Sequence, residues 1–272
     1  LVARLTLARH DGKRPFLLPF LAAALWLVNP VHTQSVTYIV QRMNAMAAVF
    51  TLLALCCYVQ ARCLQRARAD GKTGPGSILL YAGVGLFGLC GLAAKETAAI
   101  LPVLLLLYEW YFFQGLDRSW MKKQLGWISV ALALLALIGL VYMGGHPLDR
   151  LARMYEKQGF TPGQRLLTEP RVVLYYLTLL FFPHPSRLNL DYQFPLSLSL
   201  FDPATTLPAV LALPALVVVA VGTAKKHRLL SFAVTWFLVT LVIESSFIGL
   251  ALVFEHRTYL PSVFPAIAVT WF

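Results

Sequence analysis

The sequence predicts an all-α polytopic integral membrane protein, and its composition, its apolar runs and the placement of its charges favour this fold class. Of the 272 residues, 58% are hydrophobic and 13% are charged, which is about half the charged share of a soluble domain. Several continuous apolar runs approach the roughly 20 residues that a helix needs to cross a bilayer. A membrane β-barrel would instead alternate apolar and polar residues in short segments. We therefore expect a single transmembrane domain over residues 1–272.

The apolar runs predict about seven full spans and a truncated eighth. Each full run is continuous and is bounded by charged residues or by a Pro or Gly turn. The last run begins after Tyr259 and stops with the chain, which also starts without Met, so a fragment of a longer protein is expected. The full runs cover residues 15–28, 45–59, 77–94, 97–113, 125–143, 204–221 and 229–243.

A long polar loop is predicted between residues 144 and 203. It contains one short apolar piece, residues 172–182, which ends at Pro183. A helix of that length rises only about 16 Å, which is too little to cross the hydrocarbon core. We therefore expect a re-entrant or interfacial half-helix within an otherwise irregular loop.

The formal net charge of +11 lies mostly in short segments between the apolar runs, which favours a membrane protein over a nucleic-acid-binding protein. If the spans alternate in direction, one face carries 14 Lys and Arg and four carboxylates, and the other face carries nine Lys and Arg and eight carboxylates. Because Lys and Arg accumulate in cytoplasmic segments, the first face is expected to be cytoplasmic. The second face would then lie in the periplasm of a bacterium, at its inner membrane, or in the lumen of the endoplasmic reticulum. The first face comprises residues 1–14, 61–72, 114–123 and 224–228, with Glu109 at its edge.

The polar residues that could form a site all fall on the predicted outer face. Charge at bilayer depth is costly, so such residues usually face a cavity or a partner. Cations near the hydrocarbon boundary suit an anionic headgroup, and phosphate fits best, because Arg offers a planar donor fork and Lys a point charge. The candidates are His32, Arg42, Lys95, Glu96, Arg171, Asp191, Glu244, Glu255, His256, Arg257 and Tyr259.

Several candidates also have a purely structural interpretation. Lys95 and Glu96 could cap two helices, and Arg257 could be an interfacial anchor. His32 could pack behind the Asn-Pro turn, and Asp191 could form a turn. Cations of the long loop suit a solvated or lipid-headgroup face; these are Arg150, Arg153 and Lys157.

The four cysteines have no metal-ligand spacing, and free thiols are expected. No P-loop, dinucleotide fingerprint, nucleophile elbow or zinc motif occurs, so neither a cofactor nor a metal site is evident. Whether a divalent metal takes part is left open. The cysteines are Cys56, Cys57, Cys63 and Cys90.

Four blocks of the sequence resemble the transmembrane and tetratricopeptide-repeat O-mannosyltransferases and their bacterial relatives, which are GT-C glycosyltransferases. They are NPVHTQSVTYIVQRMNAMAAVFTLLAL, LAAKETAAILPVLLLLYEW, RLLTEPRVVLYYLTLLFFPHPSRLNLDYQFPLSLSLFDP and FEHRTYLPSV. The blocks follow one another along the chain in the family's order. Gln34 stands where the family usually has Glu, which leaves no acidic role at that position.

The resemblance implies a GT-C-like helical bundle that moves a sugar, mannose in the animal members, from a polyprenyl-phosphate donor to Ser or Thr of a protein. The donor phosphate or acceptor would be lined by Arg42, Lys95, Glu96, Arg171, Glu255 and Arg257. The family's catalytic carboxylate is expected in an outer loop that would precede this chain, so the catalytic residue stays unassigned.

Other functions remain open on the sequence. An O-antigen-ligase-like transferase would share the many spans and the basic outer face but would use a lipid pyrophosphate. A lipid or solute transporter would favour paired broken helices at the bilayer midplane, whereas the charges here gather at one face. A membrane scaffold without catalytic activity is a further alternative.

Overall fold

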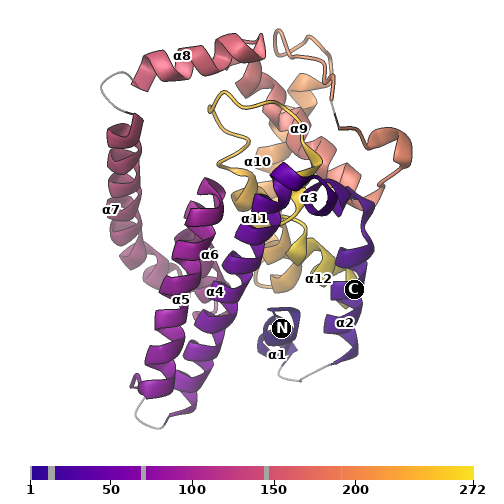
Figure 1. Cartoon of the computed structure of the whole chain (residues 1–272). Coiled ribbons are helices and arrows are strands. Elements are labelled where there is room, and N and C mark those ends of the chain that lie inside the picture. Colours follow the sequence, from indigo (N-terminus) through magenta and orange to yellow (C-terminus); the bar gives the residue numbers. More distant parts are fainter. Residues whose placement is uncertain (1, 12–15, 69–71, 144–146, 191) are drawn as a thin grey trace.

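The computed structural model describes residues 2–11, 16–68, 72–143, 147–190 and 192–272, and all regular structure within them is helical (Figure 1). Four helical segments of the described chain are long and apolar enough to cross a membrane. Two shorter apolar helices, Leu17–Val28 and Arg228–Leu241, accompany them. The all-helical membrane fold is thus supported, while the total of seven to eight spans stays a prediction. The four segments are Ile39–Ala67, Pro75–Ala94, Glu96–Phe113 and Thr206–Thr223.

The first half of the molecule is a series of helices that run alternately between its two ends (Figure 1). Helix α4 is the longest of the candidate spans, and α5 packs along it after a turn at Gly74-Pro75. Pro at the first helical position suits a helix start, because its missing N–H has no partner there anyway. The elements are α4 (Arg42–Ala67), α5 (Pro75–Ala94), η3 (Glu96–Ile100), α6 (Leu101–Tyr108), the π-helical turn η4 (Glu109–Phe113) and α7 (Arg118–Met143).

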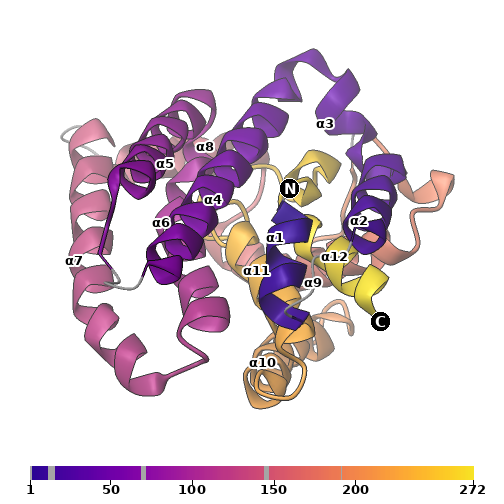
Figure 2. The same cartoon turned by 90° about the horizontal axis from the view of Figure 1, so that it is seen from below.

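The core joins the two halves of the chain through buried aromatic rings. Phe232 and Trp236 pack against Phe264, and Phe232 also packs edge-on against Tyr108. The Tyr108 hydroxyl lies 3.1 Å from Thr6 Oγ1, which ties the N-terminal helix to this core. Figure 2 shows these helices from below. They are α1 (Val2–Asp11), α2 (Leu17–Val28), α10 (Thr206–Thr223), α11 (Arg228–Leu241) and α12 (Val263–Trp271).

The prediction of a long polar loop over residues 144–203 is wrong for residues 147–181, most of which form two helices. Helix α8 (Pro147–Gln158) lies across one end of the molecule, and α9 (Pro162–Phe181) follows after Gly159 (Figure 1). Gly159 has φ of +72°, a conformation that a residue without Cβ adopts at little cost. The chain then continues through η5 (Pro185–Arg187) and an irregular segment to α10.

The expected half-helix at residues 172–182 is therefore only the second half of a 20-residue helix. A capping box begins α9, since Thr161 Oγ1 accepts from Gln164 N at 3.2 Å and Gln164 Oε1 accepts from Thr161 N at 2.8 Å. The polar first half of α9 is stable as a helix because Arg165 and Glu169 pair within the protein at 2.6 Å.

Two further segments that were expected to be polar loops are also partly helical. Residues 2–11 of the first basic stretch form α1. After α2, the Asn29 side chain accepts from Val31 N at 3.1 Å and begins a short helical run. This run comprises η1 (Pro30–His32), α3 (Thr33–Thr37) and η2 (Ile39–Gln41).

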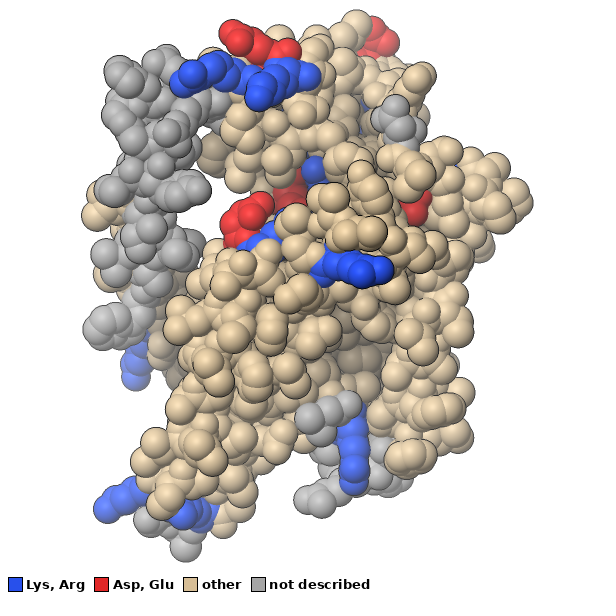
Figure 3. Space-filling model, in the orientation of Figure 1, with Lys and Arg blue, Asp and Glu red and all other residues tan. Residues whose placement is uncertain are grey.

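Charged side chains are confined to particular levels of the molecular face in Figure 3. A broad belt free of Lys, Arg, Asp and Glu separates the charges at the lower edge from a mixed cluster about midway up and from those on α8. At the lower end, Glu109 pairs with Arg62 at 2.6 Å and accepts from the Tyr58 hydroxyl at 2.9 Å. Such a belt is expected where lipid hydrocarbon surrounds a protein.

Candidate functional site

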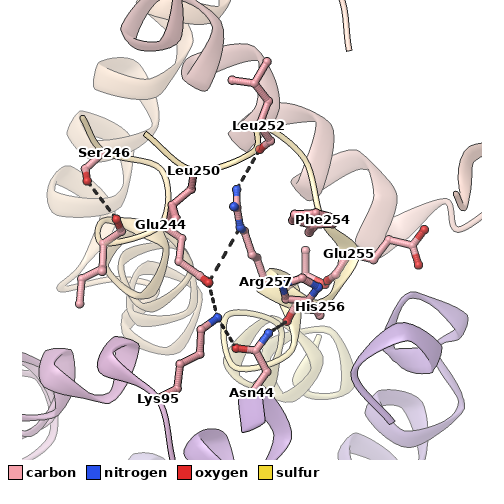
Figure 4. A network of polar contacts seen from close by, with 12 residues as sticks. Asn44, Lys95, Glu244, Ser246, Leu250, Leu252, Phe254, Glu255, His256 and Arg257 are labelled. Atoms are coloured by element: carbon pink, nitrogen blue, oxygen red, sulfur yellow. Dashed lines mark hydrogen bonds and ion pairs between the residues drawn. The ribbon is translucent and has the colours of Figure 1, made fainter. Parts of the chain in front are cut away.

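A buried ionic cluster joins the end of α5 to the segment between α11 and α12. Lys95 Nζ donates to Glu244 Oε1 and to Asn44 Oδ1, both at 2.6 Å (Figure 4). Arg257 Nε lies 3.9 Å from the same Glu244 oxygen and has no hydrogen-bond partner among the described residues. Arg257 Nη1 donates to Leu252 O at 3.0 Å. Two cations thus share one carboxylate, which leaves one positive charge uncompensated.

The segment that carries Glu244 has no regular structure from residue 242 to residue 254 and is held in place by Arg165 of α9. Arg165 is fully buried. Its Nε donates to Ser246 O and its Nη2 to Glu244 O, each at 2.8 Å, and its Nη1 donates to Leu250 O. The Arg165 guanidinium therefore fixes the backbone beside Glu244 and is not available to a ligand. Burial raises the pKa of Glu169, its ion-pair partner, to about 7.

Glu255 and Arg171, two of the predicted site residues, fasten the irregular segment after α9 instead of joining the ionic cluster. Glu255 Oε1 accepts from Asn189 N at 2.8 Å and from the Tyr192 hydroxyl at 2.7 Å, on the side facing away from Arg257 (Figure 4). Burial raises the pKa of Glu255. Arg171 Nη1 donates to Pro195 O at 2.7 Å, and its guanidinium lies over the Phe194 ring.

His256 is a neighbour of the ionic cluster that connects it to the start of α3. Its backbone N–H donates to Gln34 Oε1 at 3.0 Å, and its Nδ1 lies 3.0 Å from the same oxygen. The side chains of Asn44 and Ser35 donate to the His256 carbonyl, each at 3.4 Å. Burial, together with the positive charges of Lys95 and Arg257, lowers the pKa of His256 to about 3, so it is neutral at physiological pH.

His32, Tyr259 and Trp26 form a group of packed aromatic rings, and Tyr259 follows Arg257 of the ionic cluster by two residues. The rings of His32 and Tyr259 meet edge-on, and Trp26 packs against both. His32 Nε2 lies 3.2 Å from Ser262 Oγ. Burial lowers the pKa of His32 to about 4. The interpretation of His32 as a packing residue behind the Pro turn agrees with this geometry.

The remaining candidates lie apart from the ionic cluster or outside the described residues. Arg42 is exposed and donates to Val36 O at 3.4 Å. Glu96 is exposed in η3, with its neighbour Lys95 turned inward. Asp191 lies outside the residues that the structure describes. Of the predicted set, Lys95, Glu244 and Arg257 are brought together, with His256 beside them.

The main residue that the prediction omitted is Asn44, and Arg165 was expected only as one of the charged residues of the long loop. A signal for Asn44 is present in the sequence, since Asn44, Ala47, Ala48 and Thr51 recur at helical spacing and line one cavity with Glu244. Arg165 has no such signal, because its three acceptors are backbone carbonyls about 80 residues further along the chain.

The cavity beside the cluster is small, at about 30 Å³. This is room for one or two water molecules, which need polar partners of the kind present here. A larger apolar groove of about 290 Å³ opens between α1, α2, α4 and α12, with Trp26 and Leu52 among its lining residues. Its size and apolar lining suit a hydrocarbon chain.

The cysteines and the possible metal ligands also bear on the chemistry. The four cysteines are free thiols, as predicted. Among the described residues, no group of three or more His, Cys, Asp or Glu side chains could hold a metal ion.

Comparison of the chain with models of protein families, with curated proteins and with solved structures returned no match.

Proposed function

We propose that this chain is the membrane part of a GT-C-like glycosyltransferase that moves a sugar, with mannose the first choice, from a polyprenyl-phosphate donor to Ser or Thr of a protein. The observation that carries the proposal is the pairing of Lys95 and Arg257 around one carboxylate. A buried group with one positive charge in excess is a site for an anion. Its place at the end of an apolar belt suits the phosphate of an amphiphile.

The chemistry of the proposed reaction follows from this charge. As the sugar leaves, negative charge develops on the phosphate, and fixed cations in a water-poor site stabilise that charge. Lys95 and Arg257 would supply the cations, and Asn44 would orient the Lys95 ammonium. The apolar groove between α2 and α4 would take the lipid tail. No residue described above is assigned as the general base for the acceptor hydroxyl.

The test uses the full-length product of the encoding gene, purified in detergent. It is incubated with radiolabelled polyprenyl phosphomannose and a Ser/Thr-rich peptide, and label transferred to the peptide is counted. We expect transfer by the wild type, loss with Arg257→Ala, and retention with Arg118→Ala, an exposed cation at the other end of the chain's spans. Full transfer by Arg257→Ala would remove the cluster from the mechanism. Absence of both transfer and lipid binding in the wild type would refute the proposal.

A further inference from the structure

The ionic cluster includes a carboxylate where a site for a phosphate would be expected to hold only cations. Glu244 is 6% exposed, and its Oε1 already occupies the hydrogen-bonding direction of Lys95 Nζ. Arg257 Nε, in contrast, has no acceptor and lies too far from Glu244 for a hydrogen bond. Lys95 Nζ therefore already donates to acceptors of the protein, whereas Arg257 Nε is left to donate to an oxygen of the ligand.

The charges in the cavity wall and directly behind it sum to one positive charge. Arg257 and Glu244 line it, and Lys95 bonds to two of its lining residues. His256 also lines it but is uncharged at neutral pH. Arg165 and Glu169 are outside the lining and pair with each other. The ligand thus meets two positive charges and one negative charge.

We propose that Glu244 is a specificity-determining residue, a built-in counter-ion that makes the site accept a singly charged phosphodiester and discriminate against a pyrophosphate. This inference rests on the proposed function and deepens it. A phosphodiester with one negative charge neutralises the excess positive charge. A pyrophosphate diester with two would leave one negative charge buried without a partner, which is unfavourable because desolvation of an unpaired ion is costly.

The closed cavity supports this role for Glu244. About 30 Å³ cannot hold a phosphate group, so the ligand must displace part of the lining. The Glu244 backbone is fixed by Arg165 and lies outside any regular helix, so the side chain can exchange its contact with Lys95 for one made by the ligand without breaking a helix. When the Glu244 side chain withdraws, its carboxylate moves away from the first phosphate of the ligand. Arg165 still holds the Glu244 backbone, so the carboxylate stays close enough to repel the second phosphate of a pyrophosphate.

The experiment measures binding of polyprenyl phosphomannose and polyprenyl pyrophosphoryl mannose of one chain length to the detergent-solubilised full-length protein near pH 8. We expect the wild type to prefer the phosphodiester by about tenfold, a difference of ~1.4 kcal/mol. Glu244→Gln, which keeps the shape and an acceptor for Lys95, should strengthen pyrophosphate binding and bring the ratio of the two Kd values close to one. The matched control Glu156→Gln, an exposed carboxylate of α8, should leave the ratio unchanged.

A second variant tests the same charge without removing Glu244. Asn44→Asp places another carboxylate beside Lys95 and should weaken both ligands, the pyrophosphate more strongly. The inference is overturned, with the anion site intact, if wild type and Glu244→Gln bind both lipids with the same ratio. It is also overturned if Asn44→Asp weakens the two lipids equally. A wild type that binds neither lipid refutes the proposed function itself.

Discussion

Lys95 and Glu244 are 149 residues apart in the sequence, yet the Lys95 ammonium donates to the Glu244 carboxylate at 2.6 Å. Their side chains are only 10% and 8% exposed. Lys95 follows α5 and Glu244 follows α11, so this contact connects the helices of the first half to those of the second. The ion pair is thus a tertiary constraint as well as the centre of the proposed anion site.

Removal of one partner of this pair should destabilise the protein strongly. Lys95→Met leaves the Glu244 carboxylate buried beside Arg257 at 3.9 Å without a hydrogen bond from Lys95, and such a change typically costs about 3–5 kcal/mol. Thermal unfolding in detergent should show a clear fall in Tm, with Lys226→Met, an exposed lysine, as the unaffected control. The double variant Lys95→Met/Glu244→Leu should recover much of the loss. An equal Tm for wild type and Lys95→Met would contradict the burial of the pair.

Arg165 should be irreplaceable by lysine. A lysine keeps the charge near Glu169 but cannot donate to three carbonyls of one segment with the geometry of a guanidinium. We expect Arg165→Lys to lower the free energy of unfolding by about 2–4 kcal/mol, because buried carbonyls lose their donors. Hydrogen exchange should become faster in residues 244–250 before it does so in α4. Unchanged exchange there would mean that Arg165 does not hold the segment.

Gly249 should tolerate no side chain, because α8 lies directly against it. A Cβ at this position would lie 3.0 Å from Met154 Cβ and 3.3 Å from the Met154 backbone carbon. Gly249→Ala should therefore push α8 outward and raise the protease sensitivity of the α8–α9 turn. Gly163→Ala is the matched control, since a Cβ there meets nothing within 4 Å. Alanine at the helical position 163 should be neutral or slightly stabilising. Equal protease sensitivity of Gly249→Ala and Gly163→Ala would rule out the close approach of α8 to Gly249.

Stability should fall in mild acid because of two buried histidines. The folded pKa values of His32 and His256, about 4 and about 3, lie below the ordinary value of 6.5. The unfolded chain therefore binds more protons below pH 6.5, so the stabilising contribution is present above pH 6.5 and is lost as pH falls toward 4 and then 3. Tm measured from pH 7 to pH 4.5 should decrease more for the wild type than for His32→Asn. If Tm falls with pH to the same extent in the wild type and in His32→Asn, then His32 is not the cause of the loss of stability in acid.

The fold could be predicted well where the sequence pattern was apolar and poorly where it was polar. Lys95 and Arg257 were predicted to lie on the same side of the membrane, because the number of predicted spans between two residues determines whether they share a side. Only the second half of helix α9 could be predicted, because the apolar run covers residues 172–182 and the turns before it are charged. The motif Thr161-Pro-Gly-Gln164 is a capping signature that marks the true start.

The site was harder to predict than the fold, since a face assignment does not specify which side chains pair. Glu255 and Arg257 are two residues apart and were grouped, but they point to opposite sides of η6 (Glu255–Thr258). A short helical turn rotates successive side chains widely, so neighbours in sequence can serve different contacts. Glu255 accepts hydrogen bonds from Asn189 N and the Tyr192 hydroxyl instead of pairing with the cations of the cluster.

The 149-residue separation of Lys95 and Glu244 also orders the events of biosynthesis. The ribosome completes α5 and its lysine long before it makes the carboxylate that neutralises it. At roughly 5–20 residues per second, Lys95 waits on the order of ten seconds in the membrane without its native counter-ion. Nascent chains that stop before residue 244 therefore keep Lys95 without its carboxylate partner, and we expect them to be less stable than chains that include Glu244.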